Sequence, residues 1–136
     1  MARELFVDSS AWITLADEAD QYHDTAREAY SDLLRGYQRL VTTNLVVAET
    51  HITLRRGLGS QAALAFLESI EGSIRIEKVY STPQLEKAAA ALLRQYRDHD
   101  FSLTDAVTFA LMSEREISQA FAFEHHFITA GISLVP

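Results

Sequence analysis

The sequence predicts an α/β fold built on a mostly parallel sheet with helices on both faces. Short apolar runs that contain β-branched or aromatic residues alternate along the chain with longer segments of helical periodicity. Strands separated by helices of these lengths imply βαβ crossovers, which place the strands in parallel. The length of 136 residues is typical of one domain. We therefore expect residues 1–136 to form a single domain, with its functional crevice beyond the carboxyl ends of the strands.

A buried strand followed by a helix is expected at the beginning of the chain. Residues 4–7 form an apolar run that stops at Asp8-Ser9-Ser10, where helix-capping residues cluster. Further along, apolar residues at helical spacing and glycines that follow them indicate more helices. The elements expected up to residue 72 are helices over 11–15 and 22–35 ended by Gly36, a strand over 40–42, a helix from the cap Thr43 or Asn44 to Gly57, and a helix from the cap Ser60 to Gly72.

The second half is expected to continue the alternation. Residues 74–79 begin with alternating apolar and charged residues, which predicts a half-buried strand near an edge of the sheet. Thr82 and Pro83 can cap and open a helix. Ser102 and Asp105 have the spacing of a capping box, whose two residues exchange hydrogen bonds at a helix N-terminus. The remaining expected elements are helices over 85–96 and 102–114 and strands over 120–123 and 132–135.

Composition limits the chemistry that is available to this chain. The lack of cysteine excludes disulfides, thiolate zinc sites and a cysteine nucleophile, so a metal would need oxygen or imidazole ligands. The net charge of −7 argues against a basic nucleic-acid-binding surface unless divalent cations or a basic partner reverse the local field. The first eight residues contain only a three-residue apolar run, which predicts neither a signal peptide nor a membrane span. We expect a cytoplasmic protein with no membrane partner.

Four acidic residues fall where a parallel sheet could bring them together. They are Asp8 after the first strand, Glu49 in the apolar helix after the second, Asp105 at the start of a late helix, and Glu124 after a late strand. Oxygen ligands favour hard cations such as Mg²⁺ or Mn²⁺, which can activate water and stabilise the leaving oxygen of a phosphodiester. The adjacent His125 and His126 lack the spacing of a zinc pair, and packing or hydrogen bonding is expected for His126.

Each of the first three acids also has a simpler explanation. Asp8 could serve only as the N-cap of the helix that follows it. Asp105 could serve only as the fourth residue of its capping box. Glu49 could pair with Arg55 or lie on a polar stripe with Arg56. A capping role and a metal-binding role are compatible in the same carboxylate.

Several segments, in their order and spacing, carry a resemblance that covers nearly the whole chain. They are Phe6-Val7-Asp8-Ser9-Ser10-Ala11, Thr42-Thr43-Asn44 with Ala48-Glu49-Thr50, Ser102-Leu103-Thr104-Asp105-Ala106, and Ala120 to Phe127 followed by Gly131 and Leu134-Val135-Pro136. In these segments the sequence resembles the PIN-domain family, and within it the VapC-like toxins of toxin–antitoxin pairs. The resemblance implies a three-layer α/β/α sandwich, three or four carboxylates that bind Mg²⁺ or Mn²⁺, and endonucleolytic cleavage of RNA.

Matched residue by residue, the resemblance assigns roles to the acids. Asp8, Glu49 and Asp105 correspond to the three core acids, and Ser10 to the small hydroxyl residue of the first motif. Glu124 departs from the family, which usually has aspartate there. The additional methylene group could shift a second metal position or make Glu124 a water-mediated ligand.

The expected mechanism divides the four acids by role. Asp8 and Asp105 would hold a metal directly, while Glu49 would complete its shell or orient the attacking water. Glu124 would help to hold a second ion. The candidate substrate-binding residues are Ser10, Arg55 and Arg56, with Arg94 and Arg97 as further candidates for phosphate contacts.

The resemblance also implies partners. A toxin requires a cognate antitoxin, and an arginine from an inserted antitoxin segment would suit the carboxylates and the negative net charge. A homodimer is implied as well, and the apolar helices at 45–54 and 66–70 offer surface for it.

Two alternative functions remain open from the sequence. One is a catalytically weakened PIN-like interaction module, in which Glu124 would be the first sign of decay. The other is a different metal-dependent phosphoesterase, such as a phosphatase. Asp8-Ser9-Ser10 lacks the second aspartate that an aspartyl-phosphate enzyme would use as its acid, which disfavours the phosphatase.

Overall fold

The computed structural model describes residues 3–136, and within that range the chain folds into five strands and seven helices. Residues 1 and 2 lie outside the described residues. They belong to the N-terminal stretch for which the sequence predicts neither a signal peptide nor a membrane span. The elements are β1 (Glu4–Val7), α1 (Ser9–Ala16), α2 (His23–Gly36), β2 (Arg39–Thr43), α3 (Asn44–Leu58), α4 (Ser60–Gly72), β3 (Ile76–Val79), α5 (Pro83–Gln95), α6 (Leu103–Arg115), β4 (Gln119–Phe121), α7 (His126–Thr129) and β5 (Ser133–Val135).

The strands form one parallel sheet in the order β3-β2-β1-β4-β5. β1 lies at the centre, where Leu5, Phe6 and Val7 are fully buried. β3 lies at an edge and its residues are only half-buried, as its alternating sequence predicts. The parallel α/β sheet expected from the sequence is therefore confirmed.

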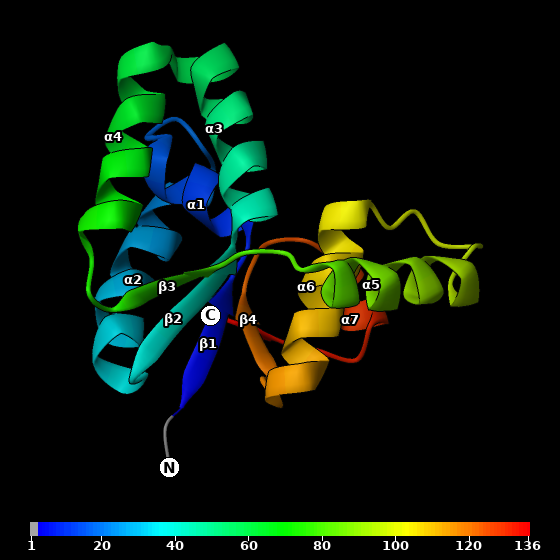
Figure 1. Ribbon diagram of the computed structural model, residues 1–136. Coiled ribbons are helices and arrows are strands. Elements are labelled where there is room, and N and C mark those ends of the chain that lie inside the picture. Colours follow the sequence, from blue (N-terminus) through cyan, green and yellow to red (C-terminus); the bar gives the residue numbers. More distant parts are fainter. Residues whose placement is uncertain (1–2) are drawn as a thin grey trace.

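Helices cover both faces of the sheet (Figure 1). The chain moves from β1 to β2 to β3 in one direction and then crosses back to β4 and β5 in the other. Because βαβ crossovers are right-handed, the helices of the two directions lie on opposite faces. Accordingly, α1 to α4 gather on one side of the sheet and α5 to α7 on the other, which confirms the three-layer sandwich.

Side-chain caps begin the helices where the sequence predicts them. The Asp8 side chain accepts a hydrogen bond at the start of α1, and the side chains of Thr43 and Thr82 do so at α3 and α5. Ser102 and Asp105 form the complete capping box of α6. The first three caps directly follow or lie near the carboxyl ends of β1, β2 and β3, and the capping box opens α6. Each cap fixes the start of its helix next to the functional edge of the sheet.

Several helix boundaries differ from the sequence prediction by one or two residues, and the junction of α3 and α4 shows why. Gly57 does not end its helix, because α3 continues to Leu58 and ends at Gly59. Gly59 has a φ of 102°, a conformation that favours glycine, and its N–H donates to the carbonyl oxygens of Leu54 and Arg55. Gly59, and not Ser60, is also the N-cap of α4.

The second half also differs at its strand ends. β3 begins at Ile76 rather than at residue 74, and β4 ends at Phe121 rather than at residue 123. The short helix α7 is absent from the sequence prediction. A single turn is too short to show apolar periodicity, which explains why the pattern misses it.

The helices that were expected to offer a dimer surface contribute mainly to the core. Val46, Val47 and Leu54 of α3 and Phe66 and Ile70 of α4 are all buried within the chain. These side chains are not available to a partner, because α3 and α4 pack against each other and over the sheet. Ile52 of α3, in contrast, is 49% exposed. The homodimer stays a prediction.

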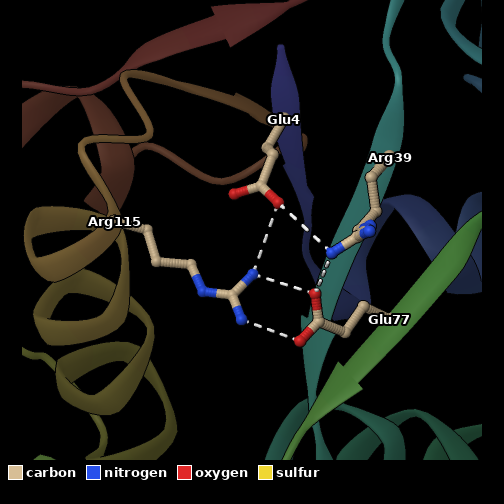
Figure 2. A network of polar contacts seen from close by, with 4 residues as sticks. All are labelled: Glu4, Arg39, Glu77 and Arg115. Carbon is tan, nitrogen blue, oxygen red and sulfur yellow. Dashed lines mark hydrogen bonds and ion pairs between the residues drawn. The ribbon is translucent and has the colours of Figure 1, made fainter. Parts of the chain in front are cut away.

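Four charged side chains form a network that joins α6 to three strands (Figure 2). Arg115, at the end of α6, makes hydrogen bonds of 2.7 and 3.0 Å to Glu77 of β3 and lies 3.4 Å from Glu4 of β1. Arg39 of β2 lies 3.0 Å from Glu77 and 3.9 Å from Glu4. The bonds from Arg115 hold the pKa of Glu77 below its ordinary value. The network therefore fixes the end of α6 that lies farthest from Asp105.

None of the helices within residues 3–136 has the length and apolar character that crossing a membrane requires.

Candidate active site

Asp8 is a buried carboxylate at the carboxyl end of the central strand. It is only 4% exposed. Its Oδ2 accepts hydrogen bonds from the backbone N–H of Ser10 at 3.1 Å and from the Ser10 hydroxyl at 2.8 Å. Burial raises the pKa of Asp8 to about 6, the hydrogen bonds from Ser10 oppose that rise, and the negative charge of Asp105 adds to it. Asp8 thus caps α1 and also carries a poorly compensated charge.

Asp105 lies in the first turn of α6, close enough to Asp8 for their charges to interact. Its Oδ2 accepts hydrogen bonds from the backbone N–H of Ser102 at 3.0 Å and from Nδ1 of His126 at 3.2 Å. Since a carboxylate accepts hydrogen bonds, Nδ1 of His126 carries the hydrogen in this pair. Residues from opposite halves of the chain therefore meet at the functional edge of the sheet.

Glu49 is joined to this edge through Ser9. The Ser9 hydroxyl donates to Oε1 of Glu49 at 2.7 Å, and Ser9 directly follows Asp8. The alternative pairing with Arg55 is not formed in the described part of the chain. Arg55 and Arg56 are exposed in the last turn of α3, about 9–10 Å beyond Glu49 along the helix axis. The structure does not bring these two arginines against the acids.

The three carboxylates share one arrangement of hydrogen bonds. Oδ2 of Asp105 and Oε1 of Glu49 each accept the side-chain hydrogen bonds found for their carboxylates among residues 3–136. Oδ2 of Asp8 accepts both bonds from Ser10, and the backbone N–H of Ser9 also lies toward the Asp8 carboxylate. One oxygen thus fixes the orientation of each carboxylate, and the other remains available to a cation or to water.

The donor set fits a hard divalent cation, although a complete metal cluster is not preformed. Within residues 3–136, no three of the His, Asp and Glu side chains are grouped closely enough to hold one ion. Asp8 and Asp105 nevertheless form an interacting pair of acids, and a cation between them would offset the repulsion and the burial that raise the pKa of Asp8. Oxygen ligands of this kind suit Mg²⁺ or Mn²⁺.

Glu124 lies in the turn between β4 and α7, with an exposed side chain. It makes no hydrogen bond or ion pair through that side chain to Asp8, Glu49 or Asp105 among the residues described. The preceding residue is attached to the site, because the backbone N–H of Phe123 donates to Oγ of Ser10 at 3.0 Å. Glu124 is therefore one residue away from the anchored backbone and is not itself positioned by neighbours.

Ser10 and His126 position the acids. The Ser10 hydroxyl donates to Asp8 and accepts from Phe123, so its hydrogen is already engaged within the protein. The sequence predicts hydrogen bonding or packing for His126, which is confirmed, but it does not identify Asp105 as the partner. The role of Ser9 as the donor to Glu49 was also not predicted. Nothing in the spacing of residues 9 and 49, or of 105 and 126, signals either contact.

Comparison with known proteins gives a consistent result along the chain. The model of the PIN domain family matches residues 5–131. The protein named 23S rRNA-specific endonuclease VapC20, from two strains of Mycobacterium tuberculosis, is 33% identical over 128 residues, which cover 93% of this chain and 94% of that protein.

Solved structures agree with this relationship. The crystal structure of Mycobacterium tuberculosis VapC20, described as a toxin that cleaves the sarcin–ricin loop, matches with a TM-score of 0.87 and 31% identity over 94% of this chain and 95% of that one. The structure of VapBC2 from Rickettsia felis bound to a promoter DNA fragment matches with a TM-score of 0.71 and 10% identity, covering 97% of both chains. At that identity the second match shows the fold alone.

Proposed function

This chain belongs to the PIN domain family, and we propose that it is a Mg²⁺- or Mn²⁺-dependent endoribonuclease that acts as the toxin of a toxin–antitoxin pair. The observation that carries this proposal is the pair formed by Asp8 and Asp105. Asp8 is a buried carboxylate next to another acid, and among residues 3–136 it forms no ion pair, so its charge is costly unless a cation binds there.

The free carboxylate oxygens define how the residues would work. Oδ1 of Asp8 and Oδ1 of Asp105 are the proposed metal ligands, while the bonded Oδ2 atoms keep both groups in place. A bound divalent ion would activate water and stabilise the charge that develops on the phosphate. Glu49, an exposed residue whose Oε1 accepts from Ser9, is suited to orient that water or to complete the ligand set. Glu124 is the proposed ligand of a second ion.

The substrate is proposed from the relative that is 33% identical over 93% of this chain. That relative is named as a 23S rRNA-specific endonuclease, and its solved structure is described as a toxin that cleaves the sarcin–ricin loop. A structured RNA loop is therefore the substrate class to test first. Arg94, exposed in the last turn of α5, and Arg97, exposed just after that helix, remain proposed phosphate contacts.

A protein partner is also part of the proposal. The related structure from Rickettsia felis is described as a VapBC assembly. A cognate antitoxin that inserts an arginine between Asp8 and Asp105 would neutralise the same charge that a metal ion neutralises. Such an antitoxin would compete with the divalent cation. We also propose that residues 1–136 form one PIN-like domain, that the protein is a homodimer, and that it is located in the cytoplasm.

The deciding experiment compares the parent protein with Asp8→Asn. Asparagine retains an oxygen that can accept both bonds from Ser10, so the fold should survive. We expect Mn²⁺-dependent cleavage of a sarcin–ricin-loop RNA by the parent and none by the variant, with both proteins showing the same circular dichroism. Undiminished cleavage by a folded Asp8→Asn protein would refute the site.

The alternative of a weakened interaction module is supported by the exposed, unanchored Glu124. Titration calorimetry with Mn²⁺ separates the two functions. A nuclease site should bind Mn²⁺ in the parent and lose that binding in Asp8→Asn, whereas a decayed site should bind it in neither protein.

A further inference from the structure

Two exposed aromatic side chains, Tyr22 and His99, each stack on a second aromatic ring, and contacts connect each stacked pair to an acid of the proposed active site. In the first pair, the rings of Tyr22 and Phe123 are nearly parallel, with centroids 5.2 Å apart and planes 7° apart. Tyr22 is 46% exposed, whereas Phe123 is half-buried against the core. Phe123 therefore supports the ring of Tyr22 from below, and much of the Tyr22 ring remains open.

The first pair is connected to Asp8 by two hydrogen bonds. The backbone N–H of Phe123 donates to Oγ of Ser10 at 3.0 Å, and that hydroxyl donates to Oδ2 of Asp8 at 2.8 Å. The position of the aromatic pair is thus coupled to the position of the carboxylate through a single serine.

The second pair is connected to Asp105 in a corresponding way. The exposed His99 ring stacks on Phe101, with centroids 5.4 Å apart and planes 20° apart. Phe101 contacts His126 edge to face, with centroids 5.5 Å apart, and Nδ1 of His126 donates to Asp105. Each of the two interacting acids consequently has one exposed aromatic ring three contacts away.

We propose that Tyr22 and His99 are stacking sites for unpaired RNA bases next to the phosphate that is cleaved. This inference rests on the proposed ribonuclease function and deepens it by assigning residues that recognise the substrate. Proteins that bind single-stranded RNA commonly stack its bases on aromatic side chains. The two rings, each exposed and supported by a second ring, provide such surfaces.

The charge of the chain favours this mode of recognition. A net charge of −7 argues against a broad basic surface that would supply most of the RNA affinity through phosphate contacts. Base stacking uses the neutral face of the nucleobase, so it does not require a basic surface. A loop RNA with unpaired bases fits this requirement better than a duplex, whose bases are already stacked.

The test combines ring removal with base removal. Tyr22→Ala and His99→Ala are compared with Tyr22→Phe, which keeps the ring, and with Tyr80→Ala, which removes another exposed aromatic residue that has no aromatic partner linked to the acids. Both cleavage (kcat/KM with Mn²⁺) and equilibrium binding of a fluorescent loop RNA are measured. We expect each of the two alanine variants to lose about 5- to 150-fold in kcat/KM and in affinity. Tyr22→Phe, which keeps the stacking ring, should lose much less than Tyr22→Ala, and Tyr80→Ala should resemble the parent.

Abasic substitutions in the RNA then identify the stacked base. At one position, removal of the base should cost the parent about as much as Tyr22→Ala does, and the two changes together should cost no more than either alone. Calorimetry should show the same Mn²⁺ affinity in all four variants as in the parent, because none of them changes an acid or a residue bonded to one.

Three results would overturn the inference: unchanged RNA affinity in both alanine variants, an equal loss in Tyr80→Ala, or a reduced Mn²⁺ affinity that accounts for the loss in activity. The nuclease proposal fails separately. If the parent binds RNA through Tyr22 and His99 but does not cleave it, the stacking sites stand and the catalytic function falls. If it neither binds nor cleaves RNA, both fall.

Discussion

Nδ1 of His126 lies 3.2 Å from Oδ2 of Asp105, the same oxygen that accepts the backbone hydrogen bond of Ser102. The two donors hold the carboxylate from one side and leave Oδ1 without a protein donor in the described chain. Because Asp105 is also the charge that helps to raise the pKa of Asp8, the orientation of this one group affects the whole pair of acids.

Replacing His126 should weaken metal binding without removing a proposed ligand. His126→Ala deletes the donor to Oδ2, and loss of such an outer partner typically lowers metal affinity by about 10- to 100-fold. We expect Mn²⁺ affinity, measured by calorimetry, to fall within that range, and cleavage to recover partly at high Mn²⁺ concentration. His126→Asn retains an N–H donor and should lose less.

The adjacent His125 provides the matched control for that experiment. Its side chain is exposed and makes no side-chain contact with the acids in the described chain, so His125→Ala should bind Mn²⁺ as the parent does. Equal losses in the His125 and His126 variants would show that the effect comes from the turn itself and not from the contact with Asp105.

The stability of the metal-free protein should fall as the pH rises from about 4 to about 6. The pKa of Asp8 is raised from its ordinary value of 3.8 to about 6 in the folded chain, mainly by burial. Between these values the folded state binds more protons than the unfolded state, so deprotonation favours unfolding, by up to about 3 kcal/mol. Urea unfolding with a chelator present, followed across this pH range, measures the contribution.

Asp8→Asn isolates the contribution of this carboxyl to the pH dependence. The variant cannot ionise at position 8, so above pH 6 it should be more stable than the parent without metal and should gain little from Mn²⁺. A variant that is less stable than the parent under those conditions would contradict the assignment of an uncompensated charge to Asp8.

Breaking the network of Glu4, Arg39, Glu77 and Arg115 should destabilise the fold, and the stability lost should depend on pH. Arg115→Met removes the two bonds to Glu77, and the expected loss is about 1 kcal/mol in the free energy of unfolding, since the groups are partly exposed. The pKa of Glu77 lies below its ordinary value, so this stabilisation should be present near neutral pH and disappear as the pH falls through that lowered pKa.

Arg35→Met is the control for the network. Arg35 pairs with Asp32 at 2.6 Å, but both side chains are about three-quarters exposed, at 74% and 77%. Solvent screens such a pair, and no measurable change in unfolding is expected. If Arg35→Met proves as destabilising as Arg115→Met, the network has no special role in fixing α6.

Glu124 should affect activity and leave stability unchanged. Its side chain is exposed and lacks a hydrogen-bonding partner in the described chain, so Glu124→Ala should unfold at the same temperature as the parent. As a proposed ligand of a second ion, it should still be needed for full cleavage. Glu124→Asp, which restores the residue usual in the family, should cleave RNA at least as fast as the parent. Equal rates for the parent, Glu124→Ala and Glu124→Asp would remove Glu124 from the site.

The sequence by itself determined the order of the strands and the starts of helices α3, α5 and α6. Apolar periodicity and local capping chemistry depend on residues within a few positions of one another, so they are visible in the chain. Thr43, Thr82 and the pair Ser102 and Asp105 act as caps as predicted. The end of α3 was misplaced because Gly57 and Gly59 are both glycines, and only the folded backbone shows which one has a positive φ.

Only the tertiary structure decided which side chains meet at the functional edge. The sequence placed Asp8 after the first strand, Glu49 within the helix that follows the second strand, and Asp105 at the start of a late helix. It could not show that Ser9 holds Glu49, that His126 holds Asp105, or that Tyr22 and His99 lie on rings attached to these acids. These contacts join residues from separate elements, and their existence depends on crossover handedness and side-chain packing across the sheet, which no local pattern records.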